Sequence, residues 1–391
     1  MSISVELSKL KHENEFSPFS KPYVSVNSIR YLTQSLESNH LQGDGNFTKK
    51  CHQFLEKFTG AQKVLLTHSC TASLEMAAIL IDLMEGDEVI MPSYTFSSTA
   101  NAVVLRGAIP VFVDIREDTL NIDENLIEPA ITSKTKAIFV VHYAGVSANM
   151  EKINQIAKKH NLFVIEDAAQ GVGSFYKNEP LGTLGHMGAY SFHATKNIIS
   201  GEGGALLIND ERFIEQSEII REKGTNRSQF IRGEVDKYTW LDKGSSYLPS
   251  DLMAAFLLSQ LEEMEEINKK RLIIWGQYQS CLEPLEKEGY LRRPFIPSDC
   301  IHNAHIYYIV VNSPDIRNDF LKYMKENGVQ CTSHYVPLHN APAGLKYGKT
   351  FGDLAITNKV ADQIVRLPLW AGMRSDSVQR VIKLLNTYFR S

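Results

Sequence analysis

The sequence predicts an α/β protein with a mostly parallel central sheet sandwiched by helices, followed by a smaller α+β domain. The chain has 391 residues, enough for two or three domains. Between about residues 60 and 210, short apolar runs alternate with helix-like segments, which is typical of parallel strands joined by helices. We therefore divide the chain into an N-terminal extension and arm (1–25), a large α/β domain (26–250), and a linking helix with a smaller C-terminal domain (251–391).

Seven apolar runs are predicted to form the strands of the large domain. They are KVLLT (63–67), DEVIMP (87–92), PVFVD (110–114), KAIFVV (136–141), LFVIED (162–167), GAYSF (188–192) and GALLI (204–208). Helix-like segments at 73–84 and 150–160 lie between the earlier strands. This order predicts a sheet covered by helices on both faces.

The pattern breaks after about residue 224. Residues 224–240 are polar, basic and weakly periodic, so we expect a long loop, and loops of this length are often functional. Residues 250–283 have apolar positions at helical spacing and predict one long helix that leads into the C-terminal domain. In that domain, 305–311 is predicted as a strand and 316–328 as a helix closed by Gly328.

Charge and hydropathy exclude two kinds of partner. The formal net charge is −4 and no run of Lys or Arg stands out, so nucleic acid is not expected. No window reaches the roughly 18 apolar residues of a membrane span, so no membrane partner is expected. The first 16 residues lack the apolar core of a signal peptide.

Cysteine and histidine spacing gives no sign of a metal site. The five cysteines are scattered without a CxxC pair, so neither disulfides nor a zinc site is indicated, and a reduced, cytoplasmic setting is expected. The segments HNAH (302–305) and HYVPLH (334–339) lack a third ligand at metal spacing. We expect their histidines to make structural or substrate contacts.

Lys196 lies between two predicted strands, just before the glycine-rich turn SGEGG. Burying an ammonium without a partner is costly, so this lysine either reaches water or has lost its charge to chemistry. The ordinary alternative is a solvated lysine before a tight turn. That alternative leaves unexplained the polar side chains around it in a segment otherwise predicted to be core. These are Ser191, His193, Thr195 and Asn197.

The segment THSCTASLE (67–75) follows the first predicted strand and begins a helix. Its residues are small and carry hydroxyl groups, and a helix N-terminus presents free N–H groups and a positive dipole end, which suits a phosphate. Plain capping of the helix by Ser69 or Thr71 explains the same residues equally well.

Asp167 ends the predicted strand in LFVIEDAAQ. Ligands of open α/β sheets bind beyond the carboxyl ends of the strands, so Asp167 is a candidate cofactor contact. Alternatively, Asp167 caps a following helix and Gln170 completes a capping box. Taken alone, the capping interpretation is the simpler one.

The combination of these three features points to pyridoxal phosphate. Its phosphate needs an anion site, its ring nitrogen needs a carboxylate that keeps it protonated, and its aldehyde needs a lysine for a Schiff base. The chain supplies these features in that order. If no cofactor binds here, the three alternative explanations (a solvated lysine, plain helix capping and a capping box) must all be true at once.

The motifs PSYTFSSTANAVVLRGAIPVFVDI, VIEDAAQGVGSFY, SFHATKNIISGEGGALL and HYVPLH resemble the DegT/DnrJ/EryC1/StrS sugar aminotransferases, which are fold-type I pyridoxal phosphate enzymes. The resemblance extends from residue 17 to the C-terminus. It implies that Lys196 bonds to the cofactor and moves the proton, and that Asp167 pairs with the ring nitrogen. It also implies that Gln170 lies near the hydroxyl side of the ring and that Phe96 stacks on the ring face. Phosphate contacts are implied for Cys70, Thr71 and Ser191.

The resemblance also implies partners. Fold-type I sites are shared across a homodimer, and Ser246 in GSSYL stands where many relatives carry an asparagine that reaches the phosphate of the other subunit. A serine is shorter than an asparagine, but it can still donate a hydrogen bond to that phosphate. Tyr335 and His339 match a segment near the sugar site. The loop 224–240 supplies Arg227 and Arg232, which we expect to bind the pyrophosphate of a nucleotide sugar.

Within the family, LLTHSCTASLEMAA, REKGTNRSQF and VDKYTWLDKGSSYLPSDLMAAF most resemble members that act in cell-surface polysaccharide biosynthesis. The reaction implied is dTDP-4-keto-6-deoxy-D-glucose plus L-glutamate giving dTDP-4-amino-4,6-dideoxy-D-galactose plus 2-oxoglutarate. One alternative is the 4-amino-4,6-dideoxyglucose epimer. Another is a non-enzymatic regulator on the same fold, which would be expected to lack Lys196 or Asp167. Dimer and tetramer cannot be distinguished from the sequence.

Overall fold

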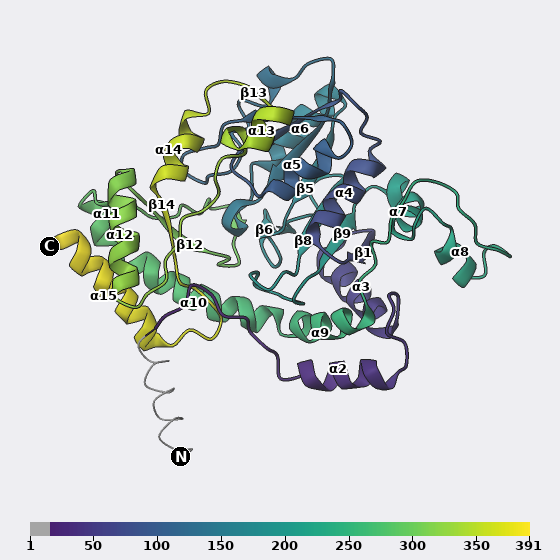
Figure 1. Ribbon diagram of the computed structural model, residues 1–391, viewed down its shortest axis with the longest axis horizontal. Coiled ribbons are helices and arrows are strands. Elements are labelled where there is room, and N and C mark those ends of the chain that lie inside the picture. The colour runs from purple at the N-terminus through teal and green to yellow at the C-terminus, as the bar shows by residue number, and fades with distance from the viewer. Residues whose placement is uncertain (1–15) are drawn as a thin grey trace.

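The computed structural model describes residues 16–391, and Figure 1 shows a large α/β part followed by a smaller C-terminal part. Most of the predicted N-terminal extension, residues 1–15, lies outside the described residues. Within residues 16–391, no helix is long and apolar enough to cross a membrane.

An eight-stranded sheet forms the centre of the large part, in the order β1-β9-β8-β5-β4-β2-β3-β13. All neighbours pair in parallel except at β9, which runs antiparallel to both β1 and β8. The strands are β1 (Lys63–Thr67), β2 (Glu88–Pro92), β3 (Ile109–Val113), β4 (Thr135–Val141), β5 (Phe163–Asp167), β8 (Met187–Ser191), β9 (Gly204–Ile208) and β13 (Lys349–Thr350). Each of the seven predicted strands is confirmed to within one residue, and β13 is an addition at the edge.

Helices cover both faces of this sheet, which confirms the predicted fold class. Along β1, Val64 and Leu66 belong to one core cluster and Leu65 to the other, because successive side chains of a strand point to opposite faces. Helix α3 packs on β1 in the first cluster, and α4 packs on β8 and β9 in the second. The helices of this part are α2 (Ser28–Glu37), α3 (Asn46–Thr59), α4 (Cys70–Leu80), α5 (Ser97–Val104), α6 (Met150–His160), α7 (Ile214–Arg221) and α8 (Arg227–Ile231).

The C-terminal part has its own core around an antiparallel sheet, in the order β10-β12-β14. Its strands are β10 (Leu291–Arg292), β12 (Tyr307–Val311) and β14 (Ile364–Leu367). Its helices are α10 (Met264–Cys281), α11 (Glu283–Lys287), α12 (Pro314–Glu326), α13 (Pro342–Tyr347), α14 (Ala355–Gln363) and α15 (Ser375–Arg390). A third small sheet joins β11 (Cys300–Ile301), β6 (Phe175–Tyr176) and β7 (Glu179–Pro180). Short 3₁₀ turns lie at Glu128–Ala130, Tyr143–Gly145, Glu211–Phe213 and Leu338–Asn340.

The prediction of one long helix over 250–283 is wrong in detail. Helix α9 (Asp251–Glu262) ends and α10 begins on either side of Glu263, whose backbone is not helical (φ −103°, ψ 10°). The Glu263 carboxylate accepts hydrogen bonds from the hydroxyl groups of Tyr23 (2.8 Å) and Ser25. The N-terminal segment is thereby tied to the junction between the two helices.

The segment 224–240 is not wholly irregular, because it contains the short helix α8. Figure 1 shows α8 and its flanking loop projecting away from the body of the subunit. Several large apolar side chains of this projection are exposed. They are Phe230, Ile231, Tyr238, Trp240 and Leu241.

Candidate active site

A cavity of about 880 Å³ lies at the carboxyl edge of the central sheet. Asp167 ends β5, Ser191 ends β8, and the N-terminus of α4 follows β1, and all of these line the cavity. The C-terminal part closes the other side. This is the position expected for ligands of open α/β sheets.

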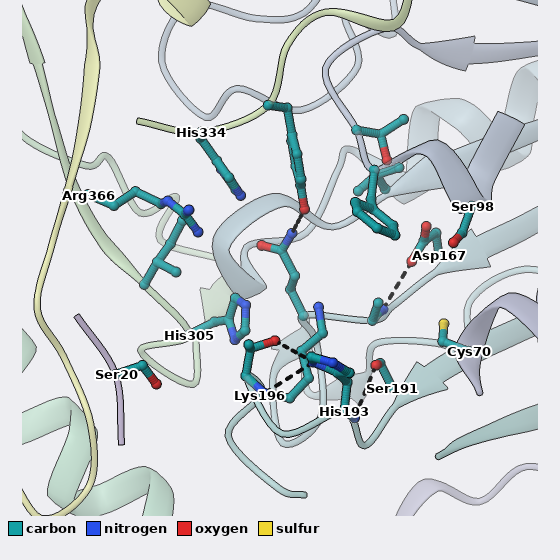
Figure 2. Close-up of a pocket in the computed structure, with 18 of the residues that line it drawn as sticks. Ser20, Cys70, Ser98, Asp167, Ser191, His193, Lys196, His305, His334 and Arg366 are labelled. Carbon is teal, nitrogen blue, oxygen red and sulfur yellow. Dashed lines mark hydrogen bonds between the residues drawn. The ribbon is translucent and has the colours of Figure 1, made fainter. Parts of the chain in front are cut away.

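Lys196 has no partner for its charge. Its Nζ makes no hydrogen bond and no ion pair within residues 16–391, and it faces the cavity (Figure 2). Burial is the main cause that lowers the pKa of this amine, while the charges of Cys70 and Asp167 oppose the shift. A lowered pKa makes the neutral, nucleophilic amine more available. The structure therefore disfavours the alternative of a solvated surface lysine.

Asp167 is a carboxylate that also lacks a cationic partner in the described chain. Its side chain is almost fully buried (5% exposed), and it accepts hydrogen bonds from the Thr99 hydroxyl (2.6 Å) and the Ala169 N–H (3.2 Å). Residues 168–174, directly after β5, form turns and no helix, so the capping-box interpretation of Asp167 and Gln170 is wrong. A buried carboxylate of this kind calls for a positively charged ligand group.

The N-terminus of α4 lies on the same side of the cavity as Lys196 and Asp167. Ser69 caps the helix, because its side chain accepts a hydrogen bond from the Ala72 N–H (3.1 Å), and Cys70 and Thr71 occupy the first turn. Strand β9 passes very close to this turn, since a Cβ on Gly204 would lie 2.5 Å from the Cys70 nitrogen. We call this side of the cavity the proximal wall: Cys70, Thr71, Asp167, Ser191 and Lys196.

Gln170 and Phe96 also line the cavity. The Gln170 amide accepts from the Ala144 N–H (2.8 Å) and donates to the Tyr335 hydroxyl (2.9 Å), so its orientation is fixed. Phe96 lines the cavity with 59% of its surface exposed, and its ring lies 6.4 Å from that of Tyr335. An exposed aromatic ring at a cavity is available to stack on a flat ligand.

The opposite side, the distal wall, consists of His305, His334 and Arg366. Figure 2 shows these residues across the cavity from Cys70 and Asp167. Burial lowers the pKa of both histidines well below the usual range, so both are neutral. His305 donates from Nδ1 to the Asn197 side-chain oxygen (3.0 Å), and His334 bonds the Tyr143 hydroxyl through Nδ1 (2.6 Å).

Sequence reasoning noted the segments that hold His305 and His334 but missed Arg366. An arginine inside the apolar run IVRLPL is the signal that would have found it, since a charge within a buried strand needs a reason. Among residues 16–391, no group of three potential metal ligands was found.

Four predicted site residues do not line the cavity of their own chain. Arg227 is paired with Glu222 (2.6 Å), and Arg232 is paired with Glu218 and Glu234. His339 bonds Ser93 through Nδ1 (2.7 Å), and Ser246 is exposed on the surface. Their roles stay predictions.

The proximal wall fits pyridoxal phosphate. An unpaired lysine, an unpaired buried carboxylate and a helix N-terminus face one cavity, and these suit the aldehyde, the ring nitrogen and the phosphate of that cofactor. The fold and the site together define a pyridoxal phosphate-dependent enzyme.

Comparison with known proteins names the family. The profile of the DegT/DnrJ/EryC1/StrS aminotransferase family matches residues 22–386. The chain is 34% identical over 385 residues to the spore coat polysaccharide biosynthesis protein SpsC of Bacillus subtilis, covering 96% of this chain and 97% of that protein.

Solved structures of similar proteins support the same family assignment. The chain is similar to the putative sugar aminotransferase Spr1654 from Streptococcus pneumoniae in its PMP-form (TM-score 0.88, 25% identity, 96% and 98% of the two chains). It is also similar to Helicobacter pylori PseC, an aminotransferase involved in the biosynthesis of pseudoaminic acid (TM-score 0.87, 26% identity, 96% and 99%). The chain belongs to the DegT/DnrJ/EryC1/StrS aminotransferase family. It is an aminotransferase, and its cofactor is pyridoxal phosphate.

Proposed function

We propose that this aminotransferase moves the amino group of L-glutamate to C4 of dTDP-4-keto-6-deoxy-D-glucose. The products are dTDP-4-amino-4,6-dideoxy-D-galactose and 2-oxoglutarate. The observation that carries the amino transfer is the unpaired Lys196 facing the unpaired Asp167 in one large cavity. The choice of sugar rests on the resemblance of residues 65–78, 221–230 and 235–256 to enzymes with that product. The roles of SpsC in spore coat polysaccharide biosynthesis and of PseC in pseudoaminic acid biosynthesis support the substrate class.

Each residue of the proximal wall has a distinct task in this proposal. Bound pyridoxal phosphate supplies an electron sink for the carbon that loses a proton. Lys196 takes the proton from the glutamate Cα and delivers one to C4 of the sugar, because its lowered pKa suits proton exchange nearer to neutral pH. Asp167 keeps the ring nitrogen protonated, and Thr99 holds the Asp167 carboxylate in place.

We also propose a homodimer in which the projecting segment of one subunit contributes to the cavity of the other. Ser246 is exposed and free to reach a neighbouring phosphate, and Arg227 and Arg232 lie on the same projection as five exposed apolar side chains. A fully active monomer in sedimentation at assay concentration would contradict this part of the proposal.

The experiment that tests the reaction is product analysis by NMR after incubation with L-glutamate and dTDP-4-keto-6-deoxy-D-glucose. An axial amino group at C4 supports the galactose product, and an equatorial one supports the glucose epimer instead. The free sugar should be a very poor acceptor, because much of the binding energy comes from the nucleotide end. Comparable activity on the free sugar, or amination at C3, would refute the substrate assignment.

A further inference from the structure

Asn197, the residue after Lys196, is a buried amide whose side chain contacts the C-terminal part of the chain. Its Nδ2 donates to the backbone carbonyl of Asn303 (2.8 Å) and to Oδ1 of Asn268 (3.0 Å) on α10. A backbone carbonyl can only accept, so this contact decides which end of the amide is the nitrogen. Oδ1 of Asn197 therefore points to the remaining neighbour, His305.

The orientation of Asn197 decides which ring nitrogen of His305 carries a proton. Oδ1 of Asn197 lies 3.0 Å from Nδ1 of His305 and can only accept, so Nδ1 carries the hydrogen. Burial lowers the pKa of His305 well below its usual range, so the imidazole is neutral and has a single N–H. Nε2 is therefore unprotonated, and it makes no hydrogen bond within residues 16–391.

Arg271 on α10 holds the main chain that carries this imidazole. It donates from Nε to the carbonyl of Ala304 (3.1 Å) and from one NH₂ group to the carbonyl of His305 (2.6 Å). Ala304 has a left-handed backbone (φ 52°), which is uncommon for an alanine. With its main chain bound by Arg271 and its ring bound by Asn197, His305 is held in one position.

His305 and Lys196 lie close together in the cavity, which both of them line (Figure 2). After burial, the charge of Lys196 is the next cause that lowers the pKa of His305. The charges of Arg271, His334 and Arg366 act on His305 in the same direction. The imidazole next to the lysine is thus kept neutral, and only its tautomer decides whether it accepts or donates.

We propose that Asn197 is a positioning residue that keeps the lone pair of the Lys196 amine free by setting the tautomer of His305. An unprotonated Nε2 accepts an N–H of the amine and orients it without occupying the lone pair. The opposite tautomer would present an N–H at the same place, and this donor would bind the lone pair with which the amine reacts. The inference rests on the proposed function, because that function gives Lys196 the proton transfer.

The first test determines the tautomer from the ¹⁵N chemical shifts of the histidine rings. It uses the enzyme form that carries the amino group on its cofactor, in which Lys196 is not bonded to the cofactor. His305→Phe identifies the signals of His305 by their loss. We expect Nδ1 to be protonated and Nε2 unprotonated in wild type near neutral pH. In Asn197→Ala, the tautomer protonated at Nε2 should become populated.

Asn209→Ala is the matched control. The Asn209 amide also donates twice, to the carbonyls of Gly182 (3.0 Å) and Gly185 (2.9 Å), but it follows β9 at the opposite edge of the sheet from the cavity. This variant removes a comparable pair of hydrogen bonds without touching a histidine of the cavity. The signals of His305 should be unchanged in Asn209→Ala.

The second test measures the reactivity of Lys196 in the same enzyme form. Competitive labelling with an amine reagent, followed by peptide mapping, should be about 3- to 10-fold slower at Lys196 in Asn197→Ala, because a hydrogen bond then occupies the lone pair. The kcat should fall by a similar factor, while the KM for glutamate should change by less than about twofold. Asn209→Ala should change neither quantity. Thermal unfolding of each variant checks that the fold is kept.

A double-mutant cycle tests whether Asn197 acts through His305. In the His305→Phe background there is no tautomer to set, so Asn197→Ala should cause no further loss of Lys196 reactivity. An undiminished effect of Asn197→Ala in this background would assign Asn197 to the fold alone.

Three other results overturn the inference. They are a wild-type His305 protonated at Nε2, an Asn197→Ala protein that keeps the wild-type tautomer, and a changed tautomer with unchanged reactivity of Lys196. Failure of the proposed reaction is distinguishable, because the tautomer and the labelling rate are measured without any sugar. A wrong sugar assignment would leave both results as expected.

Discussion

The proximal and distal walls of the cavity are built in different ways. Proximal residues directly follow strands or begin a helix: Asp167 ends β5, Ser191 ends β8, and Cys70 begins α4. Distal residues come from three separate places in the C-terminal part, at 305, 334 and 366. Tertiary packing brings both sets together, but a strand end or a helix start marks Asp167, Ser191 and Cys70 in the sequence, and no such local signal marks the three distal residues. The comparison teaches that the groups of the proximal wall can be recognised one by one from local sequence patterns, and that those of the distal wall cannot.

The largest expected effect is the loss of Lys196, on which the proximal wall depends. Lys196→Ala should abolish turnover, because no other described residue of the cavity is an unpaired amine that can exchange the proton. Steady-state assay of 2-oxoglutarate formation measures this. Near wild-type activity of Lys196→Ala would contradict a catalytic role for Lys196 and would leave the proximal wall without its proposed chemistry.

Asp167→Asn should lower turnover by about two to three orders of magnitude, since the amide cannot hold the ring nitrogen protonated by charge. Asparagine keeps only one of the two acceptor contacts, to the Thr99 hydroxyl or to the Ala169 N–H, but it also removes a buried unpaired charge, so the melting temperature of the cofactor-free protein should change little. If the variant instead melts earlier and still turns over, Asp167 serves the fold and not the chemistry.

Gly204→Ala tests whether the proximal wall depends on close backbone packing. The added Cβ would meet the Cys70 nitrogen at 2.5 Å and the Ser69 carbonyl oxygen at 2.6 Å, and backbone atoms cannot yield without moving the start of α4. Cofactor affinity, measured by fluorescence titration, should fall about 10-fold or more.

A matched glycine provides the control. Gly276 lies in α10 with no atom within 4 Å of an added Cβ, so Gly276→Ala should keep cofactor affinity and stabilise the fold by about 0.5–1 kcal/mol. Equal cofactor affinity in the two variants would show that the approach of β9 to α4 does not matter.

The smallest expected effect is on stability against pH. Because burial lowers the pKa of Lys196 in the folded state, the unfolded chain binds the proton more tightly between that pKa and the ordinary 10.5. The cost of burying the amine is full below the folded pKa and disappears as pH rises toward 10.5.

Lys196→Met should remove this cost. In cofactor-free protein near neutral pH, the variant should melt on the order of 2–4 °C higher than wild type, and the gap should close as pH rises through the window. Melting curves across pH measure it. A gap that widens with pH would mean that the folded state favours the charged lysine.

Most of the fold was predictable because its strands are buried on both faces and read as apolar runs, as in VLL of β1 and FVI of β5. The break at Glu263 was not, because it depends on contacts with Tyr23 and Ser25 far away in the chain. In the site, Asp167 was predictable because it is a charge at a strand end, and Lys196 because it lies between two apolar strands, β8 and β9. Arg366 was not predicted, although it stands in an apolar run, because only the folded chain places its guanidinium at the cavity.

The most direct measurement is borohydride reduction of the cofactor-loaded protein followed by peptide mapping. We expect the reduced cofactor to be covalently bound to Lys196, and the Lys196→Ala variant to carry none. Modification of a different lysine, or equal labelling of the variant, would contradict the claim that this unpaired amine is the centre of the site.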